Sequence, residues 1–451
     1  LSKGNYTGRK GGAALAWSSK SHPHRLLLTK QFPLGLEMLA LFQPVMLAAN
    51  KIWNSCVWHS RETYKTEGRW PSETELKAKF RAFAAWKELH SQSAQATVEE
   101  YFEAVSSYRK HRNNGHGEMN PPGFKPKNCL RTVTWKRQGF AVENNTLILK
   151  LSRTREPIIL PVPENWDVIT LPDGTRVKGA PVEAKVKAVV RRRRVENLVL
   201  HVTFDLGVIP VRTEGLVSAY DYNSALVART VSNGTQDLFV CRELLALMQY
   251  RNKITAEFQA KMSRCREGSR RWKKLLAAKL RALRKLDRRI KQMEHALTKH
   301  LAELDAAEGV ARAVAGDLKD LRRSSRTGMK NKEASQKINQ MPYHRMQAGH
   351  KYKSIMRRVH LDARTEKGTS VTCGVCGARN PAWRRKRGLW VCGSCKTTMQ
   401  ADLNGSTSFL KRVLLGDCIG RQLPFALKPP RVWRWDRRLN RFVQVSPRAA
   451  A

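Results

Sequence analysis

Four cysteines near the C-terminal end of the sequence constrain the fold more than any other feature. They form two Cys-x-x-Cys pairs separated by fifteen residues, namely Cys373, Cys376, Cys392 and Cys395. Each pair can present two thiolates from one tight turn, and the neighbouring glycines let the chain bend around an ion. Two unrelated surface pairs are the alternative. The spacing favours structural zinc in a ribbon over residues 373–395, because four thiolates leave no position for a substrate.

The charge of the chain indicates a polyanionic partner. Its 451 residues include 84 Lys and Arg against 37 Asp and Glu, a net charge of +47, which exceeds what solubility requires. The partner is either a nucleic acid or an acidic membrane surface. A membrane-spanning helix needs about twenty apolar residues, whereas the most apolar window, 38–49, has twelve and contains Gln43 and Pro44. We therefore expect a nucleic acid and no membrane.

Five further cysteines do not suggest a disulfide framework. They are scattered without a pairing rhythm, at Cys56, Cys129, Cys241, Cys265 and Cys418. Isolated thiols of this kind suit a reducing compartment, and no signal peptide is visible at the start of the sequence. We expect a cytoplasmic protein.

The first half of the sequence changes pattern twice. Residues 1–35 predict an N-terminal arm followed by a first strand. Residues 36–118 have helical periodicity, with capping-box patterns at 72–75 and 97–100. Residues 119–212 contain short β-rich segments separated by turns. The combination predicts an α+β multidomain protein.

The second half predicts a β-rich core interrupted by helices. Two buried-type strands precede long basic helices over about 242–307, and a short strand follows at 309–315. A further helix is expected over about 335–358. The final segment, 427–451, mixes cations with aromatic residues, so it is either a nucleic-acid clamp or a packed extension. Homodimerisation through the long helices is disfavoured because their apolar positions keep no heptad.

Three runs of basic residues are candidate nucleic-acid contacts. They comprise Arg191, Arg192, Arg193 and Arg194 between two long strands, Arg322 and Arg323 in a basic segment, and Arg384, Arg385, Lys386 and Arg387 inside the cysteine cluster. The alternative for each run is a solvated surface. In a chain of this charge we expect phosphate contacts, which position a protein on a nucleic acid without reading its sequence.

Two aspartates lie where a phosphodiester-cleaving centre would need them. Asp221 ends a hydrophobic strand, and Asp402 opens a helix seven residues after Cys395. Carboxylates at the ends of adjacent strands can hold divalent cations against a scissile phosphate, and a helix N-terminus favours phosphate. Considered singly, each aspartate is more often a turn residue or an N-cap than a catalytic acid.

The order of these motifs resembles the RuvC half of TnpB-like transposon nucleases and type V CRISPR effectors. A strand ending in Asp221 is followed by a long helical insertion, by a strand with Gly316-Asp317-Leu318, by the cysteine pairs and by Asp402-Leu403-Asn404. The resemblance covers nearly the whole chain and is most specific in these C-terminal motifs. It implies that Asp221 and Asp402 are two catalytic acids that bind Mg²⁺.

The resemblance also implies a domain organisation. Residues 119–212 would form a wedge β-barrel, and residues 36–118 a helical recognition insertion in it. Residues 213–372 would form an RNase H-like RuvC domain with the helical insertion, and 396–426 its C-terminal part, after the ribbon. Residues 427–451 remain a tail.

The resemblance leaves the second acid unexplained. Gly316 stands where the family pattern has a glutamate, and glycine has no side chain to bind a metal. Asp317 could substitute, Glu308 could approach from the preceding turn, or the protein could bind targets without cutting them well. Neighbouring strand residues point to opposite faces, which disfavours Asp317, and Glu308 lies beyond a strand.

The function implied by the resemblance is RNA-guided targeting of DNA. A guide RNA would pair with one strand of double-stranded DNA beside a short flanking motif, in the prokaryotic cytosol, and Mg²⁺ would support cleavage if the centre is active. One alternative is a nuclease-impaired binder that blocks transcription, which Gly316 favours. Another is a protein-guided factor that binds transposon DNA ends without RNA.

Overall fold

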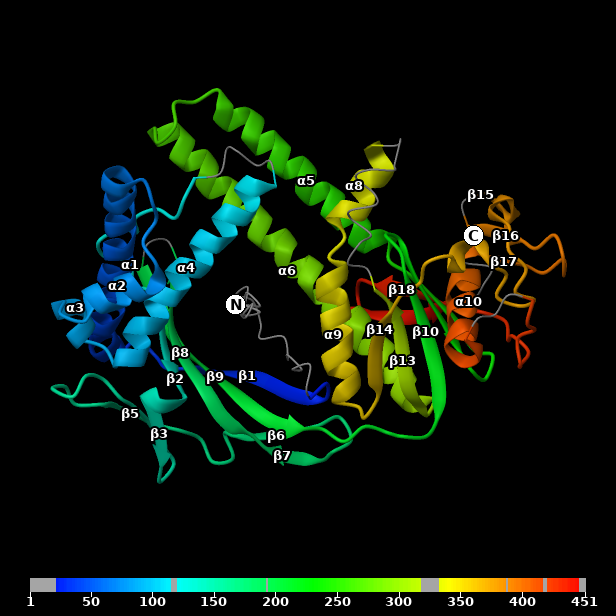
Figure 1. The fold of residues 1–451 in the computed structure, drawn as a ribbon, viewed down its shortest axis with the longest axis horizontal. Coiled ribbons are helices and arrows are strands. Elements are labelled where there is room, and N and C mark those ends of the chain that lie inside the picture. The colour runs from blue at the N-terminus through cyan, green and yellow to red at the C-terminus, as the bar shows by residue number, and fades with distance from the viewer. Residues whose placement is uncertain are drawn as a thin grey trace. The chain divides into compact units, whose positions relative to one another are not determined.

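The computed structural model describes residues 22–114, 120–191, 194–317, 332–386, 388–416 and 420–445. The chain divides into two compact units, Leu1–Gly207 and Val208–Ala451, and Figure 1 draws their elements. Seven residues named in the sequence analysis lie outside the described stretches: Arg192, Arg193, Leu318, Arg322, Arg323, Arg387 and Cys418.

The helical part of the first unit agrees with the sequence pattern. Its described helices are α1 (Leu39–Glu67), α2 (Glu73–Phe80), α3 (Ala84–Lys87) and α4 (Ser91–Asn113). The predicted capping box opens α2, where Ser72 and Glu75 exchange bonds between side chain and backbone. The second capping prediction is wrong. Thr97 lies inside α4, where its hydroxyl donates to the Ser93 carbonyl, because this helix begins at Ser91 behind the N-cap His90.

The described strands of the first unit pair into three sheets. The largest has the order β1-β9-β8-β2, formed by β1 (Arg25–Pro33), β9 (Arg194–Val208), β8 (Ala180–Arg191) and β2 (Val133–Lys136). The others join β3 (Phe140–Glu143), β4 (Thr146–Leu149) and β5 (Ile158–Pro161), and β6 (Val168–Thr170) with β7 (Arg176–Lys178). Every second residue of β9 from Leu198 to Leu206 is buried, as expected for a sheet with one face on a core. This pairing does not by itself close a barrel, so the wedge barrel remains a prediction.

A seven-stranded sheet forms the centre of the second unit. Its order is β14-β13-β10-β11-β12-β18-β19. The strands are β10 (Leu216–Tyr222), β11 (Leu226–Val231), β12 (Gln236–Val240), β13 (Val310–Gly316), β14 (His360–Arg364), β18 (Arg431–Asp436) and β19 (Arg441–Val445). Strands β10, β13 and β14 run parallel, whereas β11 is antiparallel to both of its neighbours. The carboxyl ends of the three parallel strands therefore lie at one edge, where open α/β sheets bind their ligands.

Helices cover this sheet. The described ones are α5 (Arg242–Ser263), α6 (Arg270–Ala307), α8 (Lys332–Gln340), α9 (Tyr343–Ile355) and α10 (Ala401–Leu415). The predicted long helices are α5 and α6, and α6 buries a stripe at three- and four-residue spacing: Leu286, Ile290, Met293, Leu297 and Leu301. The single helix expected over 335–358 is two helices, because Pro342 lies at the break as the N-cap of α9 and has no N–H to donate.

The two faces of the sheet bury different residues. Tyr220 and Ala315 belong to a core with residues of α6 and α9, whereas Ala219 and Val314 pack against Phe409 of α10. Neighbouring side chains of a strand point to opposite faces. Asp221, which follows Tyr220, therefore lies on the α10 face.

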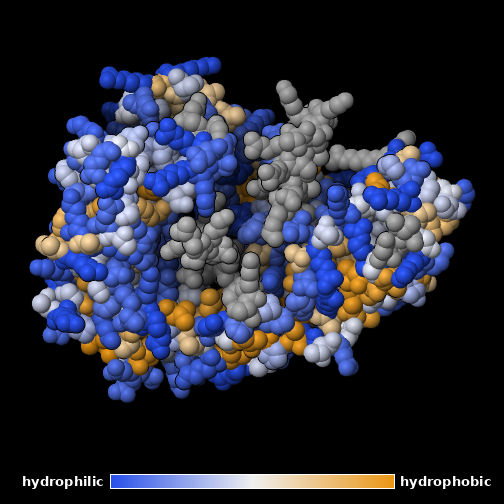
Figure 2. All heavy atoms as spheres, in the orientation of Figure 1, coloured by the Kyte–Doolittle hydropathy of each residue, from blue (hydrophilic) through white to orange (hydrophobic). Residues whose placement is uncertain are grey.

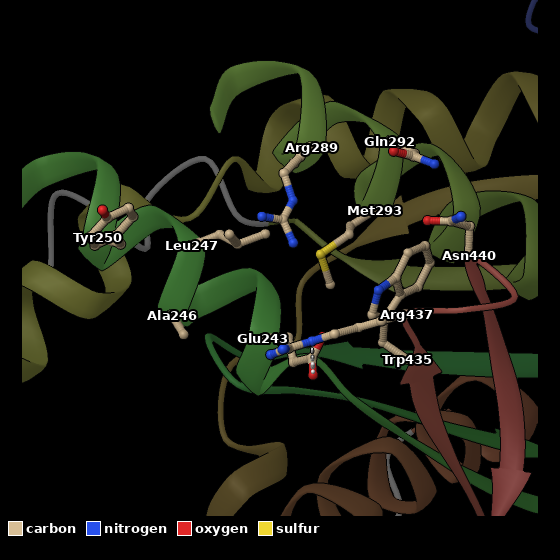
Figure 3. Close-up of a pocket in the computed structure, with 10 residues that line it drawn as sticks. All are labelled: Glu243, Ala246, Leu247, Tyr250, Arg289, Gln292, Met293, Trp435, Arg437 and Asn440. Carbon is tan, nitrogen blue, oxygen red and sulfur yellow. Dashed lines mark hydrogen bonds and ion pairs between the residues drawn. The ribbon is translucent and has the colours of Figure 1, made fainter. Parts of the chain in front are cut away.

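The basic-aromatic tail contributes β18 and β19 to the seven-stranded sheet. Strand β18 pairs in parallel with β12, and the β18–β19 hairpin lines a pocket with α5 and α6 (Figure 3). In that pocket Arg437 donates to Glu243 at 3.2 Å. The packed extension, rather than a free clamp, describes residues 431–445.

The cysteine cluster has a small sheet of its own. It consists of β15 (Arg384–Lys386), β16 (Leu389–Val391) and β17 (Thr398–Gln400). Three short 3-10 helices complete the described elements: η1 (Arg137–Gly139), η2 (Thr369–Val371) and η3 (Pro381–Trp383). Trp390 is fully buried beside Cys373 and Cys392, which gives this small region a core.

Hydrophilic side chains predominate on the face shown in Figure 2, with apolar residues gathered in smaller patches. Within the described stretches no helix has the length and apolar character needed to cross a membrane.

Candidate metal centre and active site

The four predicted cysteines converge on one point. Their sulfur atoms all lie within 4.8 Å of one another, with 3.7 Å between the Sγ atoms of Cys373 and Cys395 and 3.6 Å between those of Cys376 and Cys392. A tetrahedral zinc ion with Zn–S bonds of about 2.3 Å requires S–S separations of about 3.8 Å. The donor set therefore fits zinc, with all four coordination positions supplied by protein.

Tight turns bring each pair of cysteines together. In the first, the Cys373 N–H donates to the Ala378 carbonyl at 2.8 Å and the Gly377 N–H to the Cys373 carbonyl at 3.0 Å. Gly377 has φ of +79°, which glycine adopts without steric cost. In the second, the Cys395 N–H donates to the sulfur of Cys392 at 3.4 Å. Such N–H···S bonds stabilise thiolate charge around a metal.

The cluster is joined directly to α10. Asn404 of this helix accepts from the Gly374 N–H at 2.9 Å and donates to the Thr372 carbonyl at 2.9 Å. The buried ammonium of Lys411 donates to the carbonyls of Val375 and Arg421. The metal site thus fixes the helix that carries Asp402.

The structure brings Asp221 and Asp402 to the same edge of the sheet. Asp402 lies in the first turn of α10, and its carboxylate accepts from the Asn223 amide at 2.9 Å and from Gln400 at 2.8 Å. Asp221 lies two residues before Asn223, and its Oδ2 rests against Gly405, where a Cβ would overlap it. Strand β10 and helix α10 therefore hold the two predicted acids on one face of the sheet.

The electrostatics of Asp221 show that other carboxylates are close. Burial raises the pKa of Asp221 well above its usual range, the neighbouring Glu366 and then Asp402 raise it further, and Arg384 opposes the rise. Arg384, from the cysteine cluster, also donates to Asp402 at 3.5 Å. Burial raises the pKa of Glu366 to about 7. The three acids thus share a partly buried region that lacks full charge compensation.

Gly316 lies beside Asp221, as the motif order predicts. The register aligns Tyr220 of β10 with Ala315 of β13, so the next residues, Asp221 and Gly316, are neighbours on the α10 face. Glu308, which the sequence already disfavoured, cannot replace the missing glutamate. It lies at the opposite end of β13 and is paired there with Arg229 at 2.9 Å.

A buried ion cluster accounts for Glu308 and was missed in the sequence. Arg229 is fully buried and pairs with Asp237 at 2.6 Å and with Asp305 at 2.8 Å. Arg431 of β18 adds bonds to Asp237 at 2.7 Å and to Glu308 at 2.6 Å. This cluster ties four elements together on the α6 face, away from the candidate active site. No local motif marks it, since its members lie far apart in sequence.

The structure describes four of the ten basic side chains that are predicted to contact nucleic acid. Arg191 and Arg194 are exposed at the adjoining ends of β8 and β9, and Arg385 is exposed on β15. Arg384 lies beside the acids, as described above. Their contact with nucleic acid stays a prediction.

One segment of the chain matches a known protein family. A family model described as the TNB domain of Cas12f1-like proteins matches residues 343–409. A search of curated proteins finds no match.

Solved structures extend the likeness to most of the chain. The chain is similar to the protein in a Cas12f1–sgRNA–target DNA complex, with 15% identity, a TM-score of 0.53, and coverage of 83% of this chain and 82% of that one. It is also similar to the mini-RNA-guided endonuclease CRISPR-Cas_phi3, with 10% identity, a TM-score of 0.42, and coverage of 90% and 94%. The mixed α/β fold and the resemblance to compact type V and TnpB-like effectors are confirmed.

Proposed function

We propose that this protein is an RNA-guided effector that targets double-stranded DNA and cleaves it at a RuvC-type centre in its second unit. The observation that carries the proposal is the meeting of Asp221 and Asp402 at the carboxyl edge of three parallel strands. The likeness of the fold to a protein bound to guide RNA and target DNA supports it.

The net charge of +47 supports nucleic-acid binding on a large scale. In such effectors base pairing between guide and target supplies specificity, and the protein holds the heteroduplex by its backbone and reads only a short flanking motif. The first unit, with its helices and three sheets, would form the recognition and wedge domains. Exposed Arg191 and Arg194 would contact phosphates there.

The cleavage centre would hold Mg²⁺ between Asp221 and Asp402, whose oxygen atoms are the ligands this ion prefers. Bound divalent ions stabilise the attacking and leaving oxygens of a phosphodiester. The chain itself orients the acids, because Asn223 and Gln400 fix the Asp402 carboxylate. Arg384 is close enough to Asp402 to meet an incoming phosphate.

Zinc would be structural in this protein. Four thiolates leave no open coordination position, and the bonds from the cysteine turns to Asn404 and Lys411 connect the ion to α10. Zinc would therefore act on cleavage only by keeping Asp402 and Arg384 in place.

A second function has one specific observation in its favour. Gly316 offers no carboxylate where the resembling family has a glutamate, and a weakened metal centre would leave a protein that binds its target and blocks transcription. Binding and cleavage therefore need separate measurements.

The test uses the full chain purified with its guide RNA and incubated with matched duplex and Mg²⁺. We expect cleavage by the native chain and none by Asp221→Ala or Asp402→Ala, with target binding retained in both variants. Glu257→Gln, an exposed position on α5, is the matched control and should cut normally. Binding without cleavage by the native chain would favour the transcription-blocking function. Sequence-specific binding that survives RNase would instead indicate a protein-guided factor.

A further inference from the structure

The position of Gly316 leaves a defined gap at the carboxyl edge of the sheet. By register and alternation, a side chain at 316 would point to the α10 face beside Asp221. Asp317, the next residue, follows the strand, and alternation directs its side chain away from that face. Its N–H is bonded to the Arg364 carbonyl at 2.7 Å.

The gap is filled by another residue. A Cβ built on Gly316 would overlap the carboxylate of Glu366. Glu366 follows the end of β14 by two residues, and β14 is the parallel neighbour of β13, with Gly316 aligned to Arg364. The Glu366 carboxylate comes from the loop after β14. It thus occupies the place where the adjacent strand, β13, would carry a side chain at position 316.

Several bonds hold the loop that carries Glu366. The Thr369 N–H and hydroxyl both donate to the Glu366 carbonyl, at 3.1 and 2.8 Å, and Gly368 has φ of +86°. Arg412 of α10 donates to the Lys367 carbonyl at 2.9 Å. The loop is therefore fixed from its own turn and from α10, the same helix that carries Asp402.

The charges of Asp221 and Glu366 are left without protein partners. Among the described residues, neither carboxylate makes a hydrogen bond or an ion pair within 4.0 Å, although both are partly buried. Partly buried carboxylates are usually paired or bind a metal, because desolvation penalises an isolated charge. Elsewhere in this unit the buried acids have partners, as Asp237 and Asp305 have in Arg229.

We propose that Glu366 is the missing second acid of the centre, and that Asp221, Glu366 and Asp402 together bind the divalent cation. The inference rests on the proposed nuclease function. It names Glu366 as the source of the carboxylate that Gly316 cannot provide. A larger residue at position 316 would then have to displace the Glu366 carboxylate. The centre then has three acids, and one of them, Glu366, is supplied by the loop that follows the neighbouring strand β14.

The first test compares cleavage of matched duplex by the guide-loaded native chain, Glu366→Gln, Gly316→Ala and the control Glu257→Gln. We expect Glu366→Gln to slow cleavage on the order of 100-fold or more, as loss of a group that stabilises transition-state charge does. Gly316→Ala removes no carboxylate, and we expect it to slow cleavage by displacing Glu366. Normal cutting by Glu366→Gln in a protein that Asp221→Ala inactivates would overturn the inference but leave the proposed function intact.

The second test moves the carboxylate back to the strand. In the double variant Gly316→Glu with Glu366→Gly, the side chain at 316 enters space that Glu366 has vacated. We expect it to recover a measurable part of the cleavage lost in Glu366→Gly alone. A merely structural role of Glu366 predicts no recovery, and that result would count against the inference.

The third test does not depend on cleavage. Binding of Mn²⁺, followed by electron paramagnetic resonance and competed with Mg²⁺, should weaken in both Asp221→Ala and Glu366→Gln relative to the native chain. Loss in Asp221→Ala alone would remove Glu366 from the site while keeping the metal centre. If neither variant changes Mn²⁺ binding, the metal centre itself, and with it the proposed function, is wrong.

Discussion

At the scale of single residues, two glycines shape the candidate active site as much as its acids do. Gly316 leaves room for the Glu366 carboxylate, and Gly405 of α10 leaves room for that of Asp221. Both are close-approach positions rather than turns, since neither has a positive φ. A methyl group at either place would move a carboxylate without removing one.

The variant Gly405→Ala tests whether a methyl group on α10 displaces the Asp221 carboxylate. Alanine inside an exposed helix is more stable than glycine by about 1 kcal/mol, so helix propensity alone predicts a variant at least as stable as the native chain. Its Cβ would overlap Asp221 Oδ2, and we expect cleavage to fall by at least about tenfold. Cleavage rate and thermal unfolding of the same preparation are measured together.

Gly349→Ala is the control for that substitution. Gly349 lies in α9, and its Cβ would come no closer than 3.3 Å to Thr298 Oγ1. This variant should cut normally. Equal loss of cleavage in both variants would show that the effect is not specific to the space beside Asp221.

Arg229 is fully buried and pairs with three acids of the second unit. Arg229→Met would leave Asp305 without its arginine partner, and Asp237 and Glu308 with Arg431 alone. Removing one partner of a buried ion pair costs about 3–5 kcal/mol. We expect the free energy of unfolding of the second unit, measured in urea, to fall by that amount.

The comparison for Arg229 is an exposed pair in the same unit. Arg437 donates to Glu243 at 3.2 Å with 73% of its side chain exposed, and exposed pairs contribute about 0–1 kcal/mol. Arg437→Met should therefore change the unfolding free energy little. A similar loss in the two variants would contradict the assigned role of burial.

At the scale of elements, the cysteine cluster and α10 behave as one structural piece. Asn404 bonds both to the Gly374 N–H and to the Thr372 carbonyl, and Arg384 of β15 reaches Asp402. A change in the cluster can therefore reach Asp402 in two ways. One is through Asn404, which lies in the same turn of α10, and the other is through Arg384.

Zinc removal tests this coupling. Structural zinc sites contribute on the order of 10 kcal/mol to local folding, so a chelator, or Cys392→Ser, should unfold residues 373–400 locally. We expect release of one zinc per chain, loss of amide protection from hydrogen exchange in that segment, and loss of cleavage that zinc restores and Mg²⁺ alone does not.

Cys265→Ser provides the comparison, since Cys265 is a partly exposed free thiol outside the cluster. It should keep its zinc and its cleavage. Full cleavage by the zinc-free native chain would contradict the coupling between the cluster and Asp402.

At the scale of the whole molecule, the charge of +47 is the property that binding measurements will report first. Each phosphate contact releases counterions, so the logarithm of the binding constant for duplex DNA falls with the logarithm of salt concentration by about 0.9 per contact. The exposed ends of β8 and β9 are one place where such contacts are expected.

Replacing Arg191 and Arg194 by Gln tests that surface. If both side chains contact phosphate, the salt slope for a duplex of arbitrary sequence should decrease by about 1.8 in magnitude. Lys178→Gln, at an exposed position in the same unit, should change the slope less. An unchanged slope in the arginine variant would indicate a solvated turn.

The sequence predicted those parts of the fold that local pattern controls. The long helices, the strands around Asp221 and the cysteine cluster follow from periodicity and spacing over short distances. The sequence left the tail open between a clamp and a packed extension, because pairing of β18 with β12 depends on residues nearly two hundred positions apart, which no local window contains. The capping pattern at Thr97 failed because α4 had already begun at Ser91.

The candidate site divides in the same way. The sequence by itself determined the cysteine ligands, Asp221, Asp402 and the absence of a side chain at Gly316, because each lies in a short motif. Only the tertiary structure decided what fills the gap, since Glu366 reaches it through the parallel pairing of β13 with β14. Strand pairing places residues from distant segments side by side, and a linear motif has no means of recording which neighbour supplies a carboxylate.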